Sequence, residues 1–505
     1  MWLLIATCSG AVFYGNLRFQ REVLAVGLED DFFYYAEAAR HLASQGISTF
    51  DGVHLTNGYH PLWMLLLTAL TWLSHGASAI YPFAIELETV QFALVLGIGY
   101  FSYRICNLFG GAVASICIQL LVVSWSLVLV RTGMEVGLTL LVALAMLWFR
   151  LQNGFSWSAR NTFYYGLLAS VMVLSRLDSI LLVTMLFLFD VVPQPDKGLK
   201  RLRNSALFGF GMGPVAVYAV INEDIFHTLM PISGTAKQLR LHHTPSLAAL
   251  KSFMGYVTAR NSPLLGLAIF VTLFALFFLL KSTVRLKAYG VLVSVLLFPM
   301  VHLVAISSMS DWPLWQWYLY PWLLSSIVAS AVLLSVASEH KLVISKIDRP
   351  AYVYLCGIYL VAYAALVAGL SNPKNNLPYV AAAEISEFAQ HHDGTYAMGD
   401  RSGTVGYLSG RPVLQLEGLM MDKQYLENIR AQKDLLEVLK QYKVRYYIAT
   451  RAVRDGSGCW AVKEPWQAGA DSPAMKARIC RQPVEVLAHG NFVNTIFDLQ
   501  SPTMR

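Results

Sequence analysis

Residues 28–63 read LEDDFFYYAEAARHLASQGISTFDGVHLTNGYHPLW and lie between the first apolar segment of the chain and a long series of others. The stretch begins with three consecutive acids, Glu29, Asp30 and Asp31. Carboxylates at the edge of a bilayer are costly unless they face water, a partner or a substrate. The stretch therefore predicts a functional loop beside a membrane span; the alternative is a charged turn that only fixes the end of a helix.

The composition is that of a polytopic helical membrane protein. Of 505 residues, 56% are hydrophobic and only 14% are charged, and the apolar residues come in runs near the length of a span. These runs lie at about 2–18, 61–75, 86–106, 112–130, 133–150, 161–176, 179–192, 204–222, 263–281, 287–307, 315–337 and 351–370.

Basic clusters between the runs predict the sidedness of the chain. They lie at 150–160, 197–203, 281–287 and 341–349, and such clusters mark the cytoplasmic side. They alternate correctly only if the run at 61–75 does not cross, so we interpret that run as an embedded or interfacial helix of a first external loop, 19–85. About eleven spans remain, with the N-terminus inside. The net charge of +7 follows from this pattern and does not indicate binding to nucleic acid.

This sidedness places most charged residues that flank spans on the outer face. The set comprises Glu29, Asp30, Asp31, Arg131, Glu135, Arg176, Asp178, Lys237 and Arg260. A transporter would more often carry such groups near the midplane of the membrane, beside broken helices.

The loop itself resembles a known family. A helix is expected at about 32–44, ending at Gly46, and is followed by T-N-G-Y-H-P-L-W from Thr56. This order resembles the first external loop of bacterial GT-C glycosyltransferases, multispanning enzymes that take a sugar from a polyprenyl-phosphate carrier, including mannosyl- and arabinosyltransferases. The resemblance implies that the general base is Asp30 or Asp31, with Asp30 ranked first, and that Glu29 and His60 contact substrate.

Three shorter motifs extend the resemblance. R-T-G-M-E, with Arg131 and Glu135, resembles the family's second external loop, and S-R-L-D-S, with Arg176 and Asp178, resembles its hairpin between two spans. P-I-S-G-T-A-K, ending at Lys237, resembles the segment before the region that faces the lipid phosphate. The alternatives are a helix–helix ion pair for Arg176 with Asp178 and a solvated lysine for Lys237.

The aromatic run D-W-P-L-W-Q-W-Y-L-Y-P-W covers residues 311–322. One interpretation is an aromatic belt at the membrane interface. The other is the wall of a groove for an isoprenoid chain, with Trp315 and Tyr318 as candidate contacts, and both can hold together.

From about residue 372 onward the chain changes character, and we expect a small extracytoplasmic α/β domain, 372–505, after a membrane domain, 1–371. Helices are expected at 378–391 and 423–440, strands at 395–399 and 444–450, and a hairpin near 484–499. G-D-R-S-G-T-V-G-Y-L-S-G-R, from Gly399, resembles a segment of the tail domain of some GT-C-like proteins; glycines that build tight turns are the alternative account. Cys459 and Cys480 are expected to form a disulfide in this external domain.

Sugar transfer from a polyprenyl phosphate sets three chemical requirements. A carboxylate of the Asp30/Asp31 pair would take the proton of the acceptor hydroxyl, and Lys237, Arg131, Arg176 or Arg260 would stabilise the leaving phosphate. The lipid tail needs an apolar groove. The same acidic pair could bind Mg or Mn through oxygen ligands, although no cofactor is required by the sequence.

The sequence therefore predicts a membrane-embedded GT-C glycosyltransferase of a bacterial plasma membrane that acts on the extracytoplasmic face. Its partners would be a polyprenyl-phosphate sugar donor, membrane lipids, and a glycan, lipid or protein acceptor. A secondary transporter or lipid-linked-sugar flippase is the main alternative, and an inactive assembly protein on the same scaffold is another. Nucleotide-binding and common hydrolase motifs are absent from the sequence, which agrees with a lipid-phosphate donor.

Overall fold

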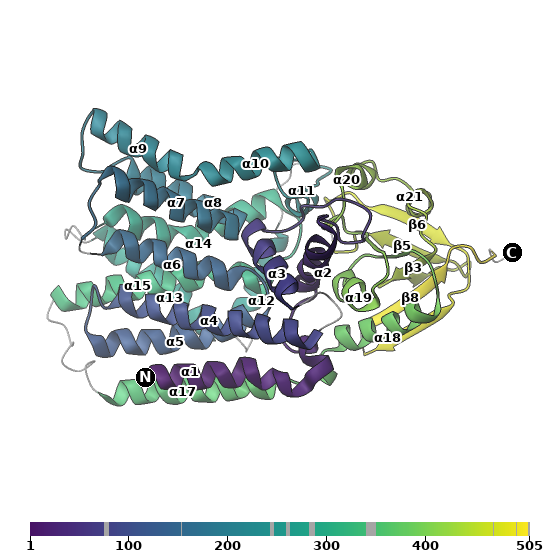
Figure 1. Ribbon diagram of the computed structural model, residues 1–505, viewed down its shortest axis with the longest axis horizontal. Coiled ribbons are helices and arrows are strands. Elements are labelled where there is room, and N and C mark those ends of the chain that lie inside the picture. The colour runs from purple at the N-terminus through teal and green to yellow at the C-terminus, as the bar shows by residue number, and fades with distance from the viewer. Residues whose placement is uncertain are drawn as a thin grey trace.

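The computed structural model describes residues 1–74, 80–152, 154–242, 247–258, 263–281, 288–339, 350–467, 469–490 and 492–502. The long helices lie side by side along the longest axis of the molecule, and a domain with a β-sheet covers one end of them (Figure 1). Short helices fill the space between the bundle and this domain. The protein is thus mostly helical, with a small mixed α/β region at its C-terminus.

The bundle is built from apolar helices that follow one another along the chain. They are α1 (Trp2–Phe13), continued by the 3-10 segment η1 (Tyr14–Ala25), α4 (Ile80–Cys106), α5 (Ala112–Arg131), α6 (Val136–Leu151), α7 (Ala159–Ser175), α8 (Ile180–Leu186), α9 (Leu199–Gly211), α10 (Gly213–Phe226), α13 (Pro263–Lys281), α14 (Tyr289–Met309), α15 (Tyr320–Glu339) and α17 (Pro350–Gly369). Within the described ranges six helices are long and apolar enough to cross a membrane, or seven if the bent pair α9 and α10 is one span.

Packing within the bundle joins helices that are close in the sequence and, through α17, helices that are far apart in it. α4 packs against α5 and α6, and α7 packs against α9. α17 closes the bundle by packing against α1 and α5, and α13 packs against α15. Large apolar side chains such as Phe270 and Tyr354 remain exposed on these outer helices, as expected where a helix faces lipid rather than water.

Four short helices lie at the end of the bundle that meets the C-terminal domain: α2 (Asp30–Gln45), α3 (Pro61–Leu73), α11 (Ile232–Lys237) and α12 (Ala248–Thr258). α3, the run expected not to cross, packs against α2. α2 begins two residues earlier than expected, so Asp30 and Asp31 lie in its first turn. Gly46 ends it in the left-handed conformation, with φ 71°.

The C-terminal domain contains a five-stranded mixed sheet in the order β2-β1-β3-β8-β7. β1 (Tyr396–Met398) pairs in parallel with β2 (Val413–Gln415) and β3 (Tyr446–Ala449), and β8 (Phe492–Asp498) pairs antiparallel with β3 and β7 (Glu485–His489). A second, antiparallel sheet contains β4 (Val453–Arg454), β5 (Trp460–Glu464) and β6 (Met475–Ile479). η5 (Pro373–Asn375), α18 (Leu377–His391), α19 (Ser402–Ser409), α20 (Lys423–Arg430) and α21 (Leu435–Gln441) complete the domain.

Most sequence expectations for this domain are confirmed, but two are corrected. The expected helices and strands at 378–391, 395–399, 444–450 and 484–499 appear as α18, β1, β3 and the β7–β8 hairpin. The single helix expected at 423–440 is wrong, because the chain breaks between α20 and α21, where Gln432 has a positive φ of 50°. The small sheet β4-β5-β6 was not expected. Its strands β5 and β6 carry Cys459 and Cys480 at their ends, and these cysteines form a disulfide with Cα atoms 4.4 Å apart.

Candidate active site

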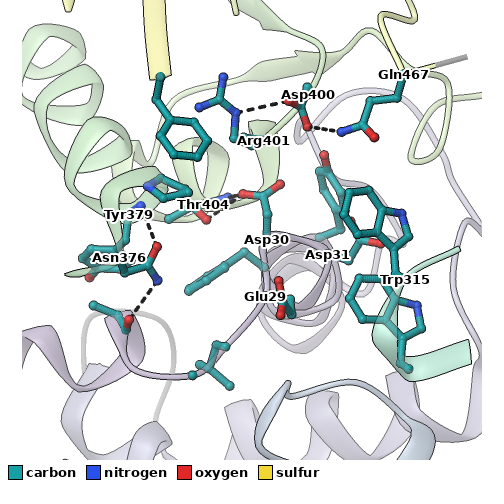
Figure 2. A pocket seen from close by; sticks show the side chains of 18 of the residues that line it. Glu29, Asp30, Asp31, Trp315, Asn376, Tyr379, Asp400, Arg401, Thr404 and Gln467 are labelled. Atoms are coloured by element: carbon teal, nitrogen blue, oxygen red, sulfur yellow. Dashed lines mark hydrogen bonds and ion pairs between the residues drawn. The ribbon is translucent and has the colours of Figure 1, made fainter. Parts of the chain in front are cut away.

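The first turn of α2 contacts the C-terminal domain through Asp30. Its carboxylate accepts hydrogen bonds from the backbone N–H of Gly403 at 3.1 Å, the N–H of Thr404 at 2.8 Å and the Thr404 hydroxyl at 2.6 Å (Figure 2). These donors lie in the first turn of α19, where N–H groups have no partner inside their own helix and favour negative charge. Asp30 therefore caps a helix of the other domain. Burial raises the pKa of its carboxyl, and the hydrogen bonds from Thr404 oppose that rise.

Backbone atoms of the C-terminal domain and of the loop that contains α2 also approach each other closely at this contact. A Cβ added at Gly403 would lie 2.3 Å from the backbone oxygen of Asp30, and one added at Gly58 would lie 1.9 Å from that of Leu419. Only glycine fits at such positions without backbone movement. The Tyr34 and Ser402 hydroxyls are hydrogen-bonded at 3.2 Å. Gly58 of the T-N-G-Y-H-P-L-W motif and the glycine-rich segment after Gly399 thus form one docking surface.

Asp31 points away from this contact and lines two cavities, one of about 860 Å³ and one of about 320 Å³. Within the described residues its carboxylate makes no hydrogen bond or ion pair. Burial, assisted by Asp30 and Glu29 and opposed by Lys237, raises the pKa of Asp31 to about 7. A carboxylate with this pKa can exchange a proton near neutral pH.

The larger cavity lies between the bundle and the C-terminal domain. Arg131 and Trp315 line it from the bundle side, together with Glu29. Glu29 accepts a hydrogen bond from Gln316 at 2.6 Å, and burial raises the pKa of its carboxyl. The guanidinium of Arg131 donates to the carbonyl of Val367 at 3.0 Å and the hydroxyl of Ser371 at 2.7 Å, so it mainly ties α5 to the end of α17.

The smaller cavity is largely apolar and contains a buried charge network. Arg176 is 2% exposed, forms an ion pair with Glu135 and donates to Asp178 at 3.0 Å. Asp178 also contacts Nε2 of His302 and the hydroxyl of Tyr320, each at 3.0 Å. Burial alone would raise the pKa of Asp178, but Arg176 and His302 hold it well below its ordinary value.

His60 lies at the edge of this network. Its Nδ1 accepts a hydrogen bond from the backbone N–H of Leu177 at 3.2 Å, and its Nε2 lies 3.5 Å from Glu135. Burial lowers the pKa of His60. The ring therefore supports the turn between α7 and α8 while one edge lines the smaller cavity.

Lys237 lines both cavities, as Asp31 does. It lies at the end of α11, and its ammonium donates to the hydroxyl of Tyr318 at 3.4 Å. Burial opposes its charge, but Tyr318 and Asp31 outweigh burial and raise the pKa of Lys237 above its ordinary value. A cation with one long hydrogen bond to a neutral partner remains available to an anionic ligand.

The sequence-predicted residues therefore separate into distinct groups. Trp315 lines the larger cavity and Tyr318 the smaller one, so the aromatic run serves both. Arg260 lies outside the described residues. The described part of the chain contains no group of three or more His, Cys, Asp or Glu side chains placed to hold a metal ion. Three hydrogen bonds already occupy most of the acceptor sites of Asp30, so a metal ion at this pair would depend on Asp31 and on further ligands.

Sequence reasoning missed the residues that the C-terminal domain brings to the larger cavity. They are Asn372, Asn375, Asn376, Pro378, Tyr379, Asp400, Arg401, Thr404, Glu417, Leu419, Arg451, Trp466, Gln467 and Phe492. The glycine-rich motif after Gly399 was the available signal, since its tight turns place Asp400, Arg401 and Thr404 opposite the acids of α2 (Figure 2). No local pattern marked Arg451 or Trp466.

Comparison with known proteins supports the fold. No family model and no curated protein sequence matches the chain. The crystal structure of ArnT from Cupriavidus metallidurans bound to undecaprenyl phosphate aligns with a TM-score of 0.59 at 14% identity, over 98% of this chain and 97% of that chain. The Archaeoglobus fulgidus oligosaccharyltransferase AglB, in complex with an inhibitory peptide and a dolichol-phosphate, aligns at 0.52 and 10% identity, over 95% of this chain and 75% of that one.

A second structure of the Archaeoglobus fulgidus oligosaccharyltransferase, with Zn and sulfate, gives a TM-score of 0.52 at 11% identity, over 88% of this chain and 67% of that chain. These similarities cover nearly the full length of the chain. The chain therefore shares the fold of ArnT and AglB, a GT-C-like fold. The expected resemblance is thereby confirmed at the level of fold.

Proposed function

We propose that this protein is a membrane glycosyltransferase that transfers a sugar from a polyprenyl-phosphate donor to an acceptor on the extracytoplasmic face. One observation carries the proposal: Asp31 and Lys237, a free carboxylate and an available cation, both lie where the two cavities meet. A group-transfer enzyme needs two substrates to meet at a base and an anion-stabilising cation.

The smaller cavity suits the donor. Lys237 and Tyr318 offer hydrogen-bond donors for a phosphate, and the cavity continues along Ile180, Ile306 and Met309. Ile180 and Met309 are 41% and 48% exposed, which supports an exit for the lipid tail between α8 and α14. The structural neighbours bound to undecaprenyl phosphate and to a dolichol-phosphate agree with a lipid of this class.

The reaction would be a direct displacement. Asp31 accepts the proton of an acceptor hydroxyl that enters from the larger cavity, and the acceptor oxygen forms a new bond to the anomeric carbon. The bond from that carbon to the phosphate oxygen breaks, and Lys237 stabilises the developing negative charge. Such a displacement inverts the anomeric centre.

Asp30 and Arg176 would act as positioning residues. The carboxylate of Asp30 accepts three hydrogen bonds from α19. These bonds orient the first turn of α2, so that the neighbouring Asp31 faces the cavities. Arg176 is neutralised by Glu135 and Asp178 and supports the wall that carries Tyr318, whose ring lies 4.6 Å from its guanidinium. This assignment reverses the order that the sequence alone gave to Asp30 and Asp31.

The proposed topology has eleven crossings of a bacterial plasma membrane. They are α1 with η1, α4, α5, α6, α7, α8 with the helical turn Phe187–Val191 that continues it, α9 with α10, α13, α14, α15 and α17. The membrane domain is 1–371. The C-terminal domain, 372–505, would then lie outside. The packing of α3 on α2 supports a helix that does not cross. A cysteine probe at Leu73, which is 56% exposed, in a background without reactive thiols, should be labelled from the outside. Labelling from the cytoplasm would contradict the topology.

A transfer assay tests the function. Purified protein is incubated with a panel of radiolabelled polyprenyl-phosphate sugars and an envelope extract, and labelled product and released lipid phosphate are measured. Wild type should consume one donor and Asp31→Asn should not, whereas the control Asp434→Asn should equal wild type because Asp434 only caps α21. Donor consumption by Asp31→Asn at the wild-type rate would refute the mechanism.

A further inference from the structure

The larger cavity combines aromatic surfaces with a dense polar lining. Trp315, Trp466 and Phe492 reach it from three separate segments, and each is partly exposed. Trp315 stacks on Trp317, with ring centroids 5.9 Å apart and planes 15° apart, so its ring is held rigidly. The guanidinium of Arg451 lies 4.7 Å from the Trp466 ring centre, and that of Arg401 lies 4.7 Å from that of Phe492.

The polar groups between these rings are of the kinds that bind vicinal hydroxyls. Carboxylates, carboxamides and guanidinium groups each offer two hydrogen-bonding atoms in one plane. Asn372, Asn375 and Gln467 supply carboxamides, and the lining contains five carboxylates and four cationic side chains. A sugar ring presents an apolar C–H face and a rim of hydroxyls, which matches an aromatic ring with such groups around it.

The same lining disfavours other acceptors. An acyl chain would have to remove charged groups from water without replacing their hydrogen bonds. An extended peptide is commonly bound by adding a strand to a sheet edge. Among the described lining residues, only Phe492, at the start of β8, belongs to a strand. The volume of about 860 Å³ is near the upper end of the range for small-ligand sites, about 300–1,000 Å³.

We propose that the larger cavity binds a saccharide acceptor, and that Trp466 and Arg451 of the C-terminal domain hold one of its sugar rings. The proposal rests on the proposed function, since it identifies the substrate class that meets the donor at Asp31. Trp315 would form the opposing surface near the base. The C-terminal domain is then a part of the acceptor site that selects a glycan chain.

Photocrosslinking in cells of the source organism tests the class of acceptor directly. The chain carries p-benzoylphenylalanine in place of Trp466, and after irradiation and exhaustive proteolysis the adduct is analysed by mass spectrometry. A series of masses separated by sugar residues is expected. A peptide adduct, a lipid chain without sugar, or no adduct at all would overturn the proposal.

A second probe separates this proposal from the proposed function. p-Benzoylphenylalanine in place of Met230, which lines the smaller cavity, should capture a polyprenyl lipid. Polyprenyl capture at Met230 without a glycan at Trp466 would overturn the acceptor class alone. A glycan at Trp466 without polyprenyl capture would leave the saccharide site standing and refute the proposed donor.

Kinetic variants give an independent readout. Trp466→Ala and Arg451→Gln should each raise KM for the acceptor in the extract by about tenfold, as expected for a lost stacking or paired contact. Trp466→Phe keeps an aromatic ring, so its KM should stay near the wild-type value. The matched control is Arg454→Gln. Like Arg451, Arg454 lies over a tryptophan ring, 5.9 Å from the ring centre of Trp460, but it lines neither cavity. Equal effects of Arg451→Gln and Arg454→Gln would contradict the proposal.

Discussion

Asp30 and Asp31 are neighbours in one helical turn, yet the structure places their carboxylates in opposite situations. Asp30 accepts three hydrogen bonds from α19, whereas Asp31 faces two cavities and Lys237. A carboxylate that accepts hydrogen bonds from two backbone N–H groups and a hydroxyl stabilises a contact between domains. One that accepts no hydrogen bond from the described residues and has a pKa of about 7 can act as a base. The two side chains are of one type, so the different roles that we propose for them follow from their tertiary environments alone.

The largest effect is expected from Asp31→Asn. An amide cannot accept the proton of the acceptor hydroxyl, and general bases contribute about 10²–10⁴-fold to rate, so transfer should fall by this factor. The melting temperature and the binding of the donor should remain close to wild type, because Asp31 makes no hydrogen bond with the described residues. Transfer and thermal unfolding measured on the same preparation would check both expectations.

Lys237→Met should reduce transfer by roughly 10²–10³-fold, the usual range for loss of one group that stabilises an oxyanion.

The same variant should also change the pH profile of transfer. Transfer by wild type should rise as the pH passes through about 7, since Asp31 must lose its proton to act. Lys237 lowers the pKa of Asp31, so its removal should move this rise to higher pH. An unchanged pH profile in the variant would contradict the electrostatic interaction between Lys237 and Asp31.

Asp30→Asn should have a smaller effect on transfer, about tenfold, together with a clear loss of stability. Losing the charge at the start of α19 weakens bonds that contribute about 1.5–3 kcal/mol each when one partner is charged. Gly403→Ala should act in the same direction, because its Cβ would lie 2.3 Å from the backbone oxygen of Asp30. Limited proteolysis of the C-terminal domain measures the loosened contact. The control is Gly255→Ala, at a glycine inside α12 with open space around it, which reports the effect of alanine in a helix without a close contact.

The smallest effect on transfer is expected from replacing Cys459 and Cys480 with serine. The disulfide closes a loop with a sequence separation of 21 residues, and such a loop stabilises a folded domain by roughly 3 kcal/mol. Thermal unfolding of the domain should therefore shift downward, while donor hydrolysis stays the same. Mass spectrometry of alkylated, non-reduced wild-type protein should find both thiols blocked from labelling; two free thiols would contradict the bond.

The sequence predicted those features of the fold that depend on local pattern. Apolar runs predicted the helical bundle, because burial in lipid acts on contiguous residues. The exclusion of 61–75 from the membrane, which the basic clusters favour, stays a prediction. The T-N-G-Y-H-P-L-W loop pointed to the acids of α2. The break at Gln432 and the sheet β4-β5-β6 were missed, because short strands and a left-handed residue leave little periodicity to detect.

The candidate site could be predicted only in part, because its partners are distant in the sequence. Thr404 reaches Asp30 across more than 370 positions, and no pattern near either residue states that they meet. The ranking of Asp30 before Asp31 depended on the loop alone, where the two acids look equivalent. Trp466 and Arg451 carried no motif, so their place in the larger cavity follows from tertiary structure only.

One paired measurement tests the central claim most directly: the rates of sugar transfer and the melting temperatures of Asp30→Asn and Asp31→Asn, determined side by side with one donor. We predict that Asp31→Asn is inactive and as stable as wild type, while Asp30→Asn retains measurable transfer and melts at a lower temperature. The opposite result, an active Asp31→Asn and an inactive Asp30→Asn of wild-type stability, would contradict the assignment of the base to Asp31.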